Sequence, residues 1–266
     1  MTNQQFDEVT DEAHRQKLSL RRCPTCDNTP EEVAPGIYVW LETGTYRYND
    51  EECVCNCERQ IELMRRYLLA HVPKAYWTFG TPEYFGDPKA WQLANEYLNN
   101  WDGNKSMGLG LEFYSPTQGT GKTFLVSWIA RQLIQRGEDV YYTRFRPLME
   151  LYHRENKERT VIESRLRDSS VLVLDEVGVA ISVAQNSYFA MEFEDLMRSR
   201  IDDNRVTLMT TNLTPDELDG EYTRVYSLLA AKQQRYAIDY EDARRVGDVY
   251  LINEAMIKSG EVRPLQ

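Results

Sequence analysis

From about residue 110 onward, the chain alternates short, continuous apolar runs with longer stretches in which apolar positions recur at helical spacing. The apolar runs are typical of parallel strands buried on both faces, and the longer stretches are typical of amphipathic helices. The alternation predicts an α/β fold, a parallel sheet flanked by helices. The predicted elements, strand and helix in turn, are 110–114, 123–135, 139–143, 145–156, 170–175, 188–203, 206–210 and 215–229, followed by a short strand at 236–238.

Two further helices are predicted upstream, at 58–71 and 88–101, and Pro73 is expected to end the first. The second carries four large or apolar residues at helical spacing, which we expect to be core residues rather than a platform for nucleobases. They are Trp91, Ala94, Leu98 and Trp101. The domain boundary is expected near residue 70, which divides the chain into a small domain, 1–70, and an α/β domain, 71–266.

The charge of the chain argues against a strongly basic nucleic-acid surface in either part. Its 266 residues carry a formal net charge of −11; residues 1–70 hold 13 Asp and Glu against 8 Lys and Arg, a net of −5 that leaves −6 for the rest. DNA contact would therefore require a local cluster or an assembled pore. Residues 1–20 have no apolar core of signal-peptide type, and no apolar run approaches about 18 residues, so we expect a soluble intracellular protein.

A glycine-rich loop separates the predicted strand 110–114 from the predicted helix 123–135. In a phosphate-binding loop, backbone N–H groups and the helix N-terminus bind the phosphates, a lysine adds a point charge, and a hydroxyl binds Mg²⁺. Pro116 stands where the full motif has its first glycine, and an ordinary glycine turn is the alternative. The flanking strand and helix favour an ATP site, with the nucleotide contacting Gly119, Thr120, Gly121, Lys122, Thr123 and Phe124.

Two acids end the predicted strand 170–175, about 50 residues after the loop. Asp175 is expected to bind Mg²⁺ together with Thr123, and Glu176 to orient or deprotonate an attacking water. A buried strand that ends in two acids also occurs for structural reasons alone. The position after a phosphate loop favours the catalytic interpretation.

Asn212 follows the predicted strand 206–210 and is a candidate for the side chain that holds the nucleophilic water against the γ-phosphate. The alternative is that it caps the next helix. Thr214-Pro215-Asp216-Glu217 already has the pattern of a capping box with proline at the first helical position. Asn212 is therefore available for another role.

All five cysteines lie within the first 57 residues. Intracellular proteins rarely use cysteines for disulfides, whereas a C-x₂-C pair followed by a second close pair suits a tetrahedral zinc site. Predicted strands at 37–41 and 45–48, around Glu42-Thr43-Gly44, give the segment the look of a zinc ribbon. Five candidates compete for four positions, and spacing excludes none of them: Cys23, Cys26, Cys53, Cys55 and Cys57.

AAA+ replicative helicase loaders of the DnaC/DnaI type, which many phages also carry, resemble this chain in the order of their motifs. The shared motifs are Cys-x₂-Cys, Cys-x-Cys, a helix, Val-Pro-Lys-Ala-Tyr at 72–76, the loop, Leu-Asp-Glu-Val-Gly at 174–178 and Thr-Thr-Asn-Leu at 210–213. The resemblance implies an oligomeric ATPase of the bacterial cytoplasm that uses ATP and Mg²⁺, single-stranded DNA as a ligand, and a domain 1–70 that binds the hexameric helicase. Cys55 and Cys57 match the family's C-x-C better than Cys53, which implies a Zn²⁺ site of Cys23, Cys26, Cys55 and Cys57.

The same resemblance suggests roles for two arginines. Thr223-Arg224-Val225 resembles the loaders' Ser-Arg-Leu, whose arginine reaches the γ-phosphate of the neighbouring subunit, although the preceding Gly220-Glu221-Tyr222 departs from the usual Gly-Glu-Arg. Arg244 resembles the second sensor arginine. Surface ion pairs are the alternative role for both.

The sequence therefore predicts a zinc-binding, partner-binding domain followed by a AAA+ ATPase that loads a ring helicase onto DNA. One alternative is a transposition ATPase of the IstB type, which shares nearly the same motor but usually lacks this cysteine set. The other is a nucleotide-gated adaptor with little hydrolysis, against which Lys122, Asp175 and Glu176 argue.

Overall fold

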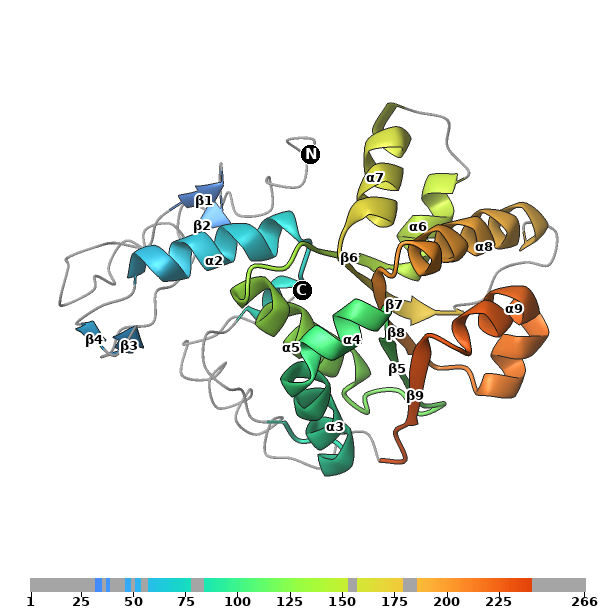
Figure 1. Cartoon of the computed structure of the whole chain (residues 1–266), viewed down its shortest axis with the longest axis horizontal. Helices are drawn as coiled ribbons and strands as arrows, with labels where there is room; N and C mark the ends of the chain where they lie inside the picture. Colours follow the sequence, from blue (N-terminus) through green and yellow to red (C-terminus); the bar gives the residue numbers. More distant parts are fainter. Residues whose placement is uncertain are drawn as a thin grey trace, which may run out of the picture. The chain divides into compact units, whose positions relative to one another are not determined.

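The computed structural model divides the chain into two compact units, Met1–Thr81 and Pro82–Gln266 (Figure 1). The structure describes residues 32–34, 37–38, 46–48, 51–53, 57–77, 84–152, 157–178 and 186–240, and the side chains of 62–77, 84–151, 159–178, 188–217 and 223–240.

The first unit contains two short antiparallel strand pairs. Strand β1 (Glu32–Ala34) pairs with β2 (Ile37–Tyr38), and β3 (Tyr46–Tyr48) pairs with β4 (Glu51–Cys53). These pairs differ from a hairpin around Glu42-Thr43-Gly44. The sequence between the paired strands supplies local turn dipeptides, Pro-Gly at 35–36 and Asn-Asp at 49–50, which favour closer pairings.

The helix of the first unit, α2 (Cys57–Leu69), ends before the proline that was expected to stop it. His71 adopts a left-handed φ of 60°, which ends the helix two residues ahead of Pro73. A 3₁₀ turn, η3 (Lys74–Tyr76), follows, and the Trp77 indole donates to the carbonyl of Val72.

A five-stranded, all-parallel sheet forms the centre of the second unit, with strand order β6-β7-β8-β5-β9 (Figure 1). Its strands are β5 (Gly110–Tyr114), β6 (Val140–Arg144), β7 (Val171–Val177), β8 (Val206–Thr211) and β9 (Gln233–Ala237). All five were predicted to within three residues at each end. The α/β fold class is confirmed.

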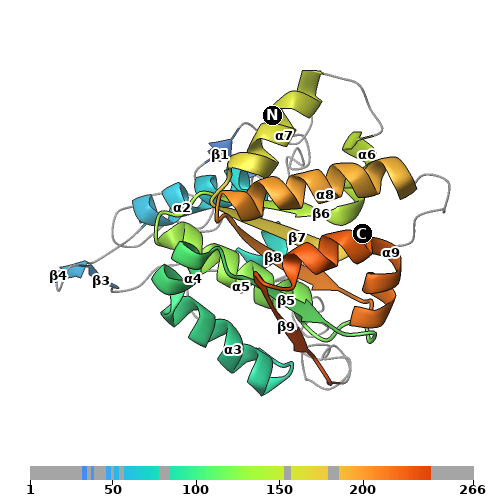
Figure 2. The same ribbon diagram turned by 45° about the vertical axis from the view of Figure 1, so that its right-hand side comes forward.

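Helices cover both faces of this sheet (Figure 2). They are α3 (Pro88–Asn99), α4 (Trp101–Met107), α5 (Lys122–Gln135), α6 (Phe145–Tyr152), α7 (Lys157–Asp168), α8 (Asn186–Asp202) and α9 (Pro215–Leu229). One face packs α5, with α3 against it. Side chains of α6, α7, α8 and α9 form the core on the other face, around Phe145, Leu172 and Phe193.

Two of these helices were not predicted as separate elements. Asn100 leaves the helical conformation at φ −97° and ψ 20°, so the predicted helix 88–101 ends there and α4 begins. Helix α7 is rich in charged residues, and among its described side chains, 159–168, Ile162 and Leu166 are the apolar ones that pack against the core. This apolar pattern is too sparse to recognise.

One buried arginine, Arg200, connects the starts of β7 and β8, at the edge of the sheet opposite the candidate site. The Arg200 side chain is fully buried and donates to the carbonyls of Leu166 at 2.7 Å and Ser169 at 3.0 Å, near the start of β7. It also donates to the carbonyl of Val206 at 2.6 Å, at the start of β8. These bonds join the segment before β7 to the start of β8.

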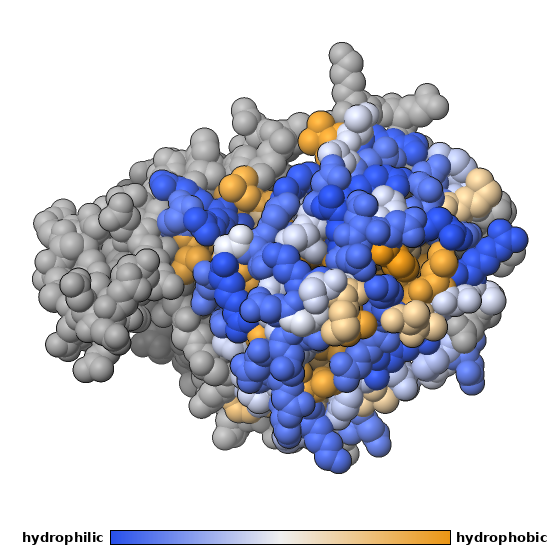
Figure 3. All heavy atoms as spheres, viewed as in Figure 1, coloured by the Kyte–Doolittle hydropathy of each residue, from blue (hydrophilic) through white to orange (hydrophobic). Residues whose placement is uncertain are grey.

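The visible surface of the second unit is mostly hydrophilic, with apolar residues in small groups (Figure 3). In the part of the chain that the structure describes, no helix is both long and apolar enough to span a membrane.

Candidate active site

The glycine-rich loop joins β5 to α5 at the carboxyl edge of the sheet. Gly119 and Gly121 adopt left-handed φ angles of 76° and 87°, which favour glycine. A Cβ atom at Gly121 would lie only 2.8 Å from the ring of Tyr84. Helix α5 begins at Lys122, so its free N–H groups and its positive dipole end adjoin the loop. The predicted strand, loop and helix are confirmed as structure.

Pro116 is accommodated without the glycine of the full motif. The buried Ser115 side chain accepts a hydrogen bond from the Thr117 N–H at 3.3 Å, which closes a turn across the proline. The Ser115 N–H donates to the carbonyl of Thr211 at the end of β8. Proline has no N–H to satisfy, and its side chain is exposed here, so it fits the first bend of the loop.

Lys122 folds back onto the loop. Its amine donates to the carbonyls of Ser115 at 3.1 Å and Thr117 at 2.9 Å, and to the Thr120 hydroxyl at 3.2 Å. Burial lowers the pKa of the Lys122 amine to about 8, and the carboxylate of Asp175 partly offsets that effect. The Lys122 amine, which was predicted to bind phosphates, is therefore bonded to neutral acceptors of the loop.

Asp175 is almost fully buried, at 1% exposure, and three hydroxyls surround its carboxylate. Thr123 donates to Oδ1 at 3.0 Å, Thr210 donates to the same oxygen at 2.5 Å, and Tyr142 donates to Oδ2 at 2.7 Å. Thr123 comes from α5, Tyr142 from β6 and Thr210 from β8. The predicted metal pair, Thr123 and Asp175, lies in direct contact.

Glu176 stands at an irregularity in β7. The pairing of β7 with β8 shifts register between Leu174 and Val177, and Glu176 takes a left-handed φ of 60° with an exposed side chain. Its N–H donates to the Thr210 hydroxyl at 2.9 Å. Bulges redirect side chains at strand ends. Here the irregularity frees Glu176 from the strand alternation, next to a buried Asp175.

The predicted capping box of α9 is confirmed. The Thr214 hydroxyl accepts from the Glu217 N–H, the Glu217 carboxylate accepts from the Thr214 N–H, and Pro215 is the first helical residue. Asn212 lies directly after β8, partly buried, and makes no side-chain hydrogen bond to another described residue. Its role as a γ-phosphate sensor remains a prediction.

Aromatic side chains adjoin the loop on the α3 side. Phe124, in the first turn of α5, lies with its ring centroid 5.4 Å from that of Tyr84, and Trp91 stacks on Tyr84 at 5.5 Å and 20°. Trp128 extends the cluster. Ala94, Leu98 and Trp101 are buried, as expected of core residues.

The remaining predicted site residues lie apart from this centre. Arg224 is exposed in the second half of α9, and no contact among the described residues joins it to the phosphate loop of its own chain. Arg244 lies outside the described residues, as do Cys23, Cys26 and Cys55, and of Cys53 and Cys57 the structure describes the backbone only. Among the side chains that are described, no group of three or more His, Cys, Asp or Glu residues is placed to hold a metal ion.

Sequence reasoning missed Tyr142, Thr210 and Tyr84. The first two lie on neighbouring strands and meet Asp175 only through the register of the sheet. Tyr142 and Thr210 each stand near the carboxyl end of a predicted strand, and that position is the sequence signal for a residue close to the site. Tyr84 lies outside any strand or helix and has no such signal.

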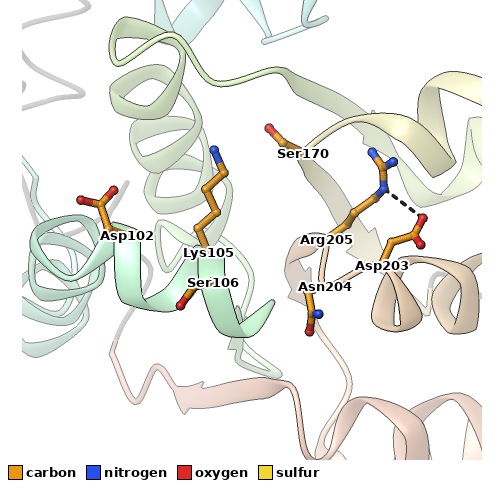
Figure 4. A pocket seen from close by; sticks show the side chains of 7 residues that line it. All are labelled: Asp102, Lys105, Ser106, Ser170, Asp203, Asn204 and Arg205. Carbon is orange, nitrogen blue, oxygen red and sulfur yellow. Dashed lines mark hydrogen bonds and ion pairs between the residues drawn. The ribbon is translucent and has the colours of Figure 1, made fainter.

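A pocket of about 650 Å³ lies at the opposite edge of the sheet, beside the starts of β7 and β8. Residues of α4 line one side of it and residues of the turns before β7 and β8 line the other (Figure 4). They are Asp102, Lys105 and Ser106, then Ser170, Asp203, Asn204 and Arg205. Its charges are of both signs, and Arg205 pairs with Asp203 at 3.3 Å.

Comparison with known proteins agrees with this geometry. Residues 114–225 match the family described as "IstB-like ATP binding protein". The replicative helicase loader DnaC of Escherichia coli (strain K12) is 25% identical over 137 residues, 50% of this chain and 53% of that protein, and the DnaC of Shigella flexneri matches equally. The chain thus spans about half the length of these relatives.

Solved structures share the fold. A crystal structure of the DnaC helicase loader superposes with a TM-score of 0.52 at 21% identity, covering 63% of this chain and 100% of that one. For DnaI the TM-score is 0.50 at 21% identity, covering 59% and 88%. For AMPPCP-bound DnaA of Aquifex aeolicus it is 0.50 at 18%, covering 73% and 58%.

Residues 114–225 of the second unit are thus similar to an ATP-binding family, and the unit shares its fold with the helicase loaders DnaC and DnaI and with AMPPCP-bound DnaA. The predicted resemblance to helicase loaders of the DnaC type is confirmed.

The low pKa of Lys122 predicts how ATP affinity depends on pH. Below a pKa of about 8 the free protein already carries the lysine charge, whereas above it ATP must bind together with a proton. Between about pH 7.5 and about pH 9, the affinity for ATP should fall roughly tenfold. Calorimetry in buffers of different ionisation enthalpy measures both the affinity and the number of protons taken up. Lys89→Ala, at an exposed position of α3, should keep this profile. Constant ATP affinity without proton uptake would contradict the assignment of the Lys122 amine to the phosphates.

Proposed function

We propose that the chain is an ATP-dependent helicase loader of DNA replication, which hydrolyses ATP as an oligomer and binds single-stranded DNA and a hexameric replicative helicase. The observation that carries the proposal is the contact between Thr123 of the phosphate loop and the buried Asp175, with Glu176 beside it. The similarity to relatives named as replicative helicase loaders supports the choice of partner. Such a protein acts in the cytoplasm of a bacterial cell, and a phage genome is one place where it would be encoded.

Magnesium fits the residues of this site. The Thr123 hydroxyl and the Asp175 carboxylate are hard oxygen donors, already 3.0 Å apart, and Mg²⁺ prefers such ligands with phosphate oxygens completing its shell. When bound, the ion neutralises phosphate charge. Tyr142 and Thr210 keep the carboxylate oriented meanwhile.

The protein's own groups account for the remaining steps. Lys122 exchanges its loop acceptors for phosphate oxygens, and the N–H groups at the start of α5 bind the same anion. Glu176 accepts the proton of the attacking water, and Asn212 orients that water. Arg224 stabilises the negative charge of the transferred phosphoryl group at the ATP site of the neighbouring subunit. Arg244 stabilises the same charge as the second sensor arginine.

The N-terminal domain, which we assign to residues 1–70, holds one Zn²⁺ and binds the helicase. Cysteine thiolates in two close pairs are the usual ligands of structural zinc. DNA binding is assigned to the oligomer, because an acidic chain must align several weak basic contacts to hold a single strand.

The second candidate is a transposition ATPase of the IstB type. The match of residues 114–225 to the IstB-like family is the observation in its favour. Because that match concerns the motor and not the partner, it is equally compatible with a loader. The cysteine set at 23–57 favours the loader.

Glu176→Gln and Lys122→Ala should fail in different ways. The amide at 176 preserves shape but cannot accept a proton, so this variant should bind ATP, lose turnover by roughly 10²-fold or more, and accumulate as an ATP-bound oligomer. Lys122→Ala should lose ATP binding and nucleotide-dependent assembly. Turnover assays and light scattering measure both, and normal turnover by Glu176→Gln would refute its role as the base.

Zinc content should be one ion per chain, held by Cys23, Cys26, Cys55 and Cys57, because structural zinc is nearly always four-coordinate. Metal analysis of the five single Cys→Ser variants tests the ligand set. Cys53→Ser, the matched control, should keep its zinc. Zinc loss in Cys53→Ser with retention in Cys55→Ser would overturn the choice.

Arg224 should act across the subunit boundary. Arg224→Ala should bind ATP normally and hydrolyse it about 10³-fold more slowly, the usual effect of removing an arginine finger. Mixed with Lys122→Ala, which keeps its own Arg224, the variant should regain activity. Arg198→Ala, an exposed arginine of α8 paired with Glu194, should behave like the unmodified protein. If the mixtures co-assemble but recover no activity, Arg224 does not act at the ATP site of a neighbouring subunit.

A further inference from the structure

Tyr84 contacts the phosphate loop from outside the sheet. Its hydroxyl donates to the carbonyl of Thr120 at 3.3 Å, and its ring lies beside Gly121, where a Cβ atom would come within 2.8 Å. The residue stands 36 positions before Thr120, ahead of α3. It therefore acts on the loop through tertiary contact alone.

The contact fixes one peptide group of the loop. The Thr120 carbonyl and the Gly121 N–H belong to the same planar trans peptide, so they point in opposite directions. While Tyr84 holds the carbonyl on its own side, the N–H must face the other side, which is the side that the proposed ATP site assigns to the phosphates. Glycine tolerates both signs of φ, so without this bond the peptide can turn over.

The position of the Tyr84 hydroxyl is itself constrained. Trp91 stacks on the ring and Phe124 borders it, with centroids 5.5 and 5.4 Å away. Gly86 passes so close that a Cβ there would lie 2.3 Å from the hydroxyl oxygen. Burial, reinforced by Asp87, raises the pKa of the Tyr84 phenol, so the hydroxyl keeps its proton and remains a donor at neutral pH.

We propose that Tyr84 is a positioning residue that holds the Thr120–Gly121 peptide in its phosphate-binding orientation before the nucleotide arrives. The proposal rests on the ATP-binding role given to the loop above. It differs from a nucleobase contact, because the hydroxyl engages the loop backbone and the ring packs against Trp91 and Phe124. Pre-orienting a binding group removes part of the ordering cost of binding.

Tyr84→Phe in the full-length chain tests the proposal, because it keeps the ring and removes the donor. Affinities for ADP and for inorganic pyrophosphate, measured by calorimetry, should both fall about three- to tenfold, the usual effect of one hydrogen bond. The thermal midpoint should change little. Tyr97→Phe is the matched control, since it removes a tyrosine hydroxyl that donates to the carbonyl of Leu109, away from the loop, and should leave both affinities unchanged.

Gly86→Ala provides a second perturbation that keeps Tyr84 but displaces its hydroxyl, and it should weaken both ligands in the same way. Unchanged affinities in Tyr84→Phe would overturn the proposal, as would a loss for ADP alone, which would assign Tyr84 to the nucleoside. A wild-type chain that binds neither ligand would instead overturn the proposed ATP site itself.

Discussion

The candidate site depends on the hydrogen bonds that the buried carboxylate of Asp175 accepts. A charged oxygen pair that is 1% exposed must be satisfied by donors, and three neutral hydroxyls provide them. They come from β6, from β8 and from α5, so the helix that begins at the loop and the strands on both sides of β7 are tied to one side chain. Because the donors are neutral, the negative charge remains available for a divalent cation.

This arrangement links the sheet to the proposed chemistry. Parallel strands end at the same edge, and β7 lies between β6 and β8, so Asp175 has a neighbour on either side. Thr210 adds a second bond, accepting from the N–H of Glu176 at the irregularity of β7. The same hydroxyl therefore orients the proposed metal-binding acid, Asp175, and the backbone of the proposed base, Glu176. Asn212 follows two residues later on the same segment.

The strands and the loop could be predicted because each depends on local pattern: continuous apolar runs, glycines, and a capping box at Thr214. Helix α7 escaped prediction because ion pairs and two apolar residues hold it, and α4 because Asn100 interrupts one helical pattern. The contacts of Asp175 with Tyr142 and Thr210, and that of Tyr84 with Thr120, could not be predicted, since they arise from register and packing between segments distant in sequence.

In the proposed function, ATP bound at this site acts together with a replicative helicase held by the same chain. The most direct measurement is a pull-down from the native host with the tagged full-length Glu176→Gln chain, in the presence and absence of ATP. We expect a replicative helicase to be recovered, in an amount that changes when ATP is added. Recovery of a transposase, or of neither partner under both conditions, would overturn the proposed function.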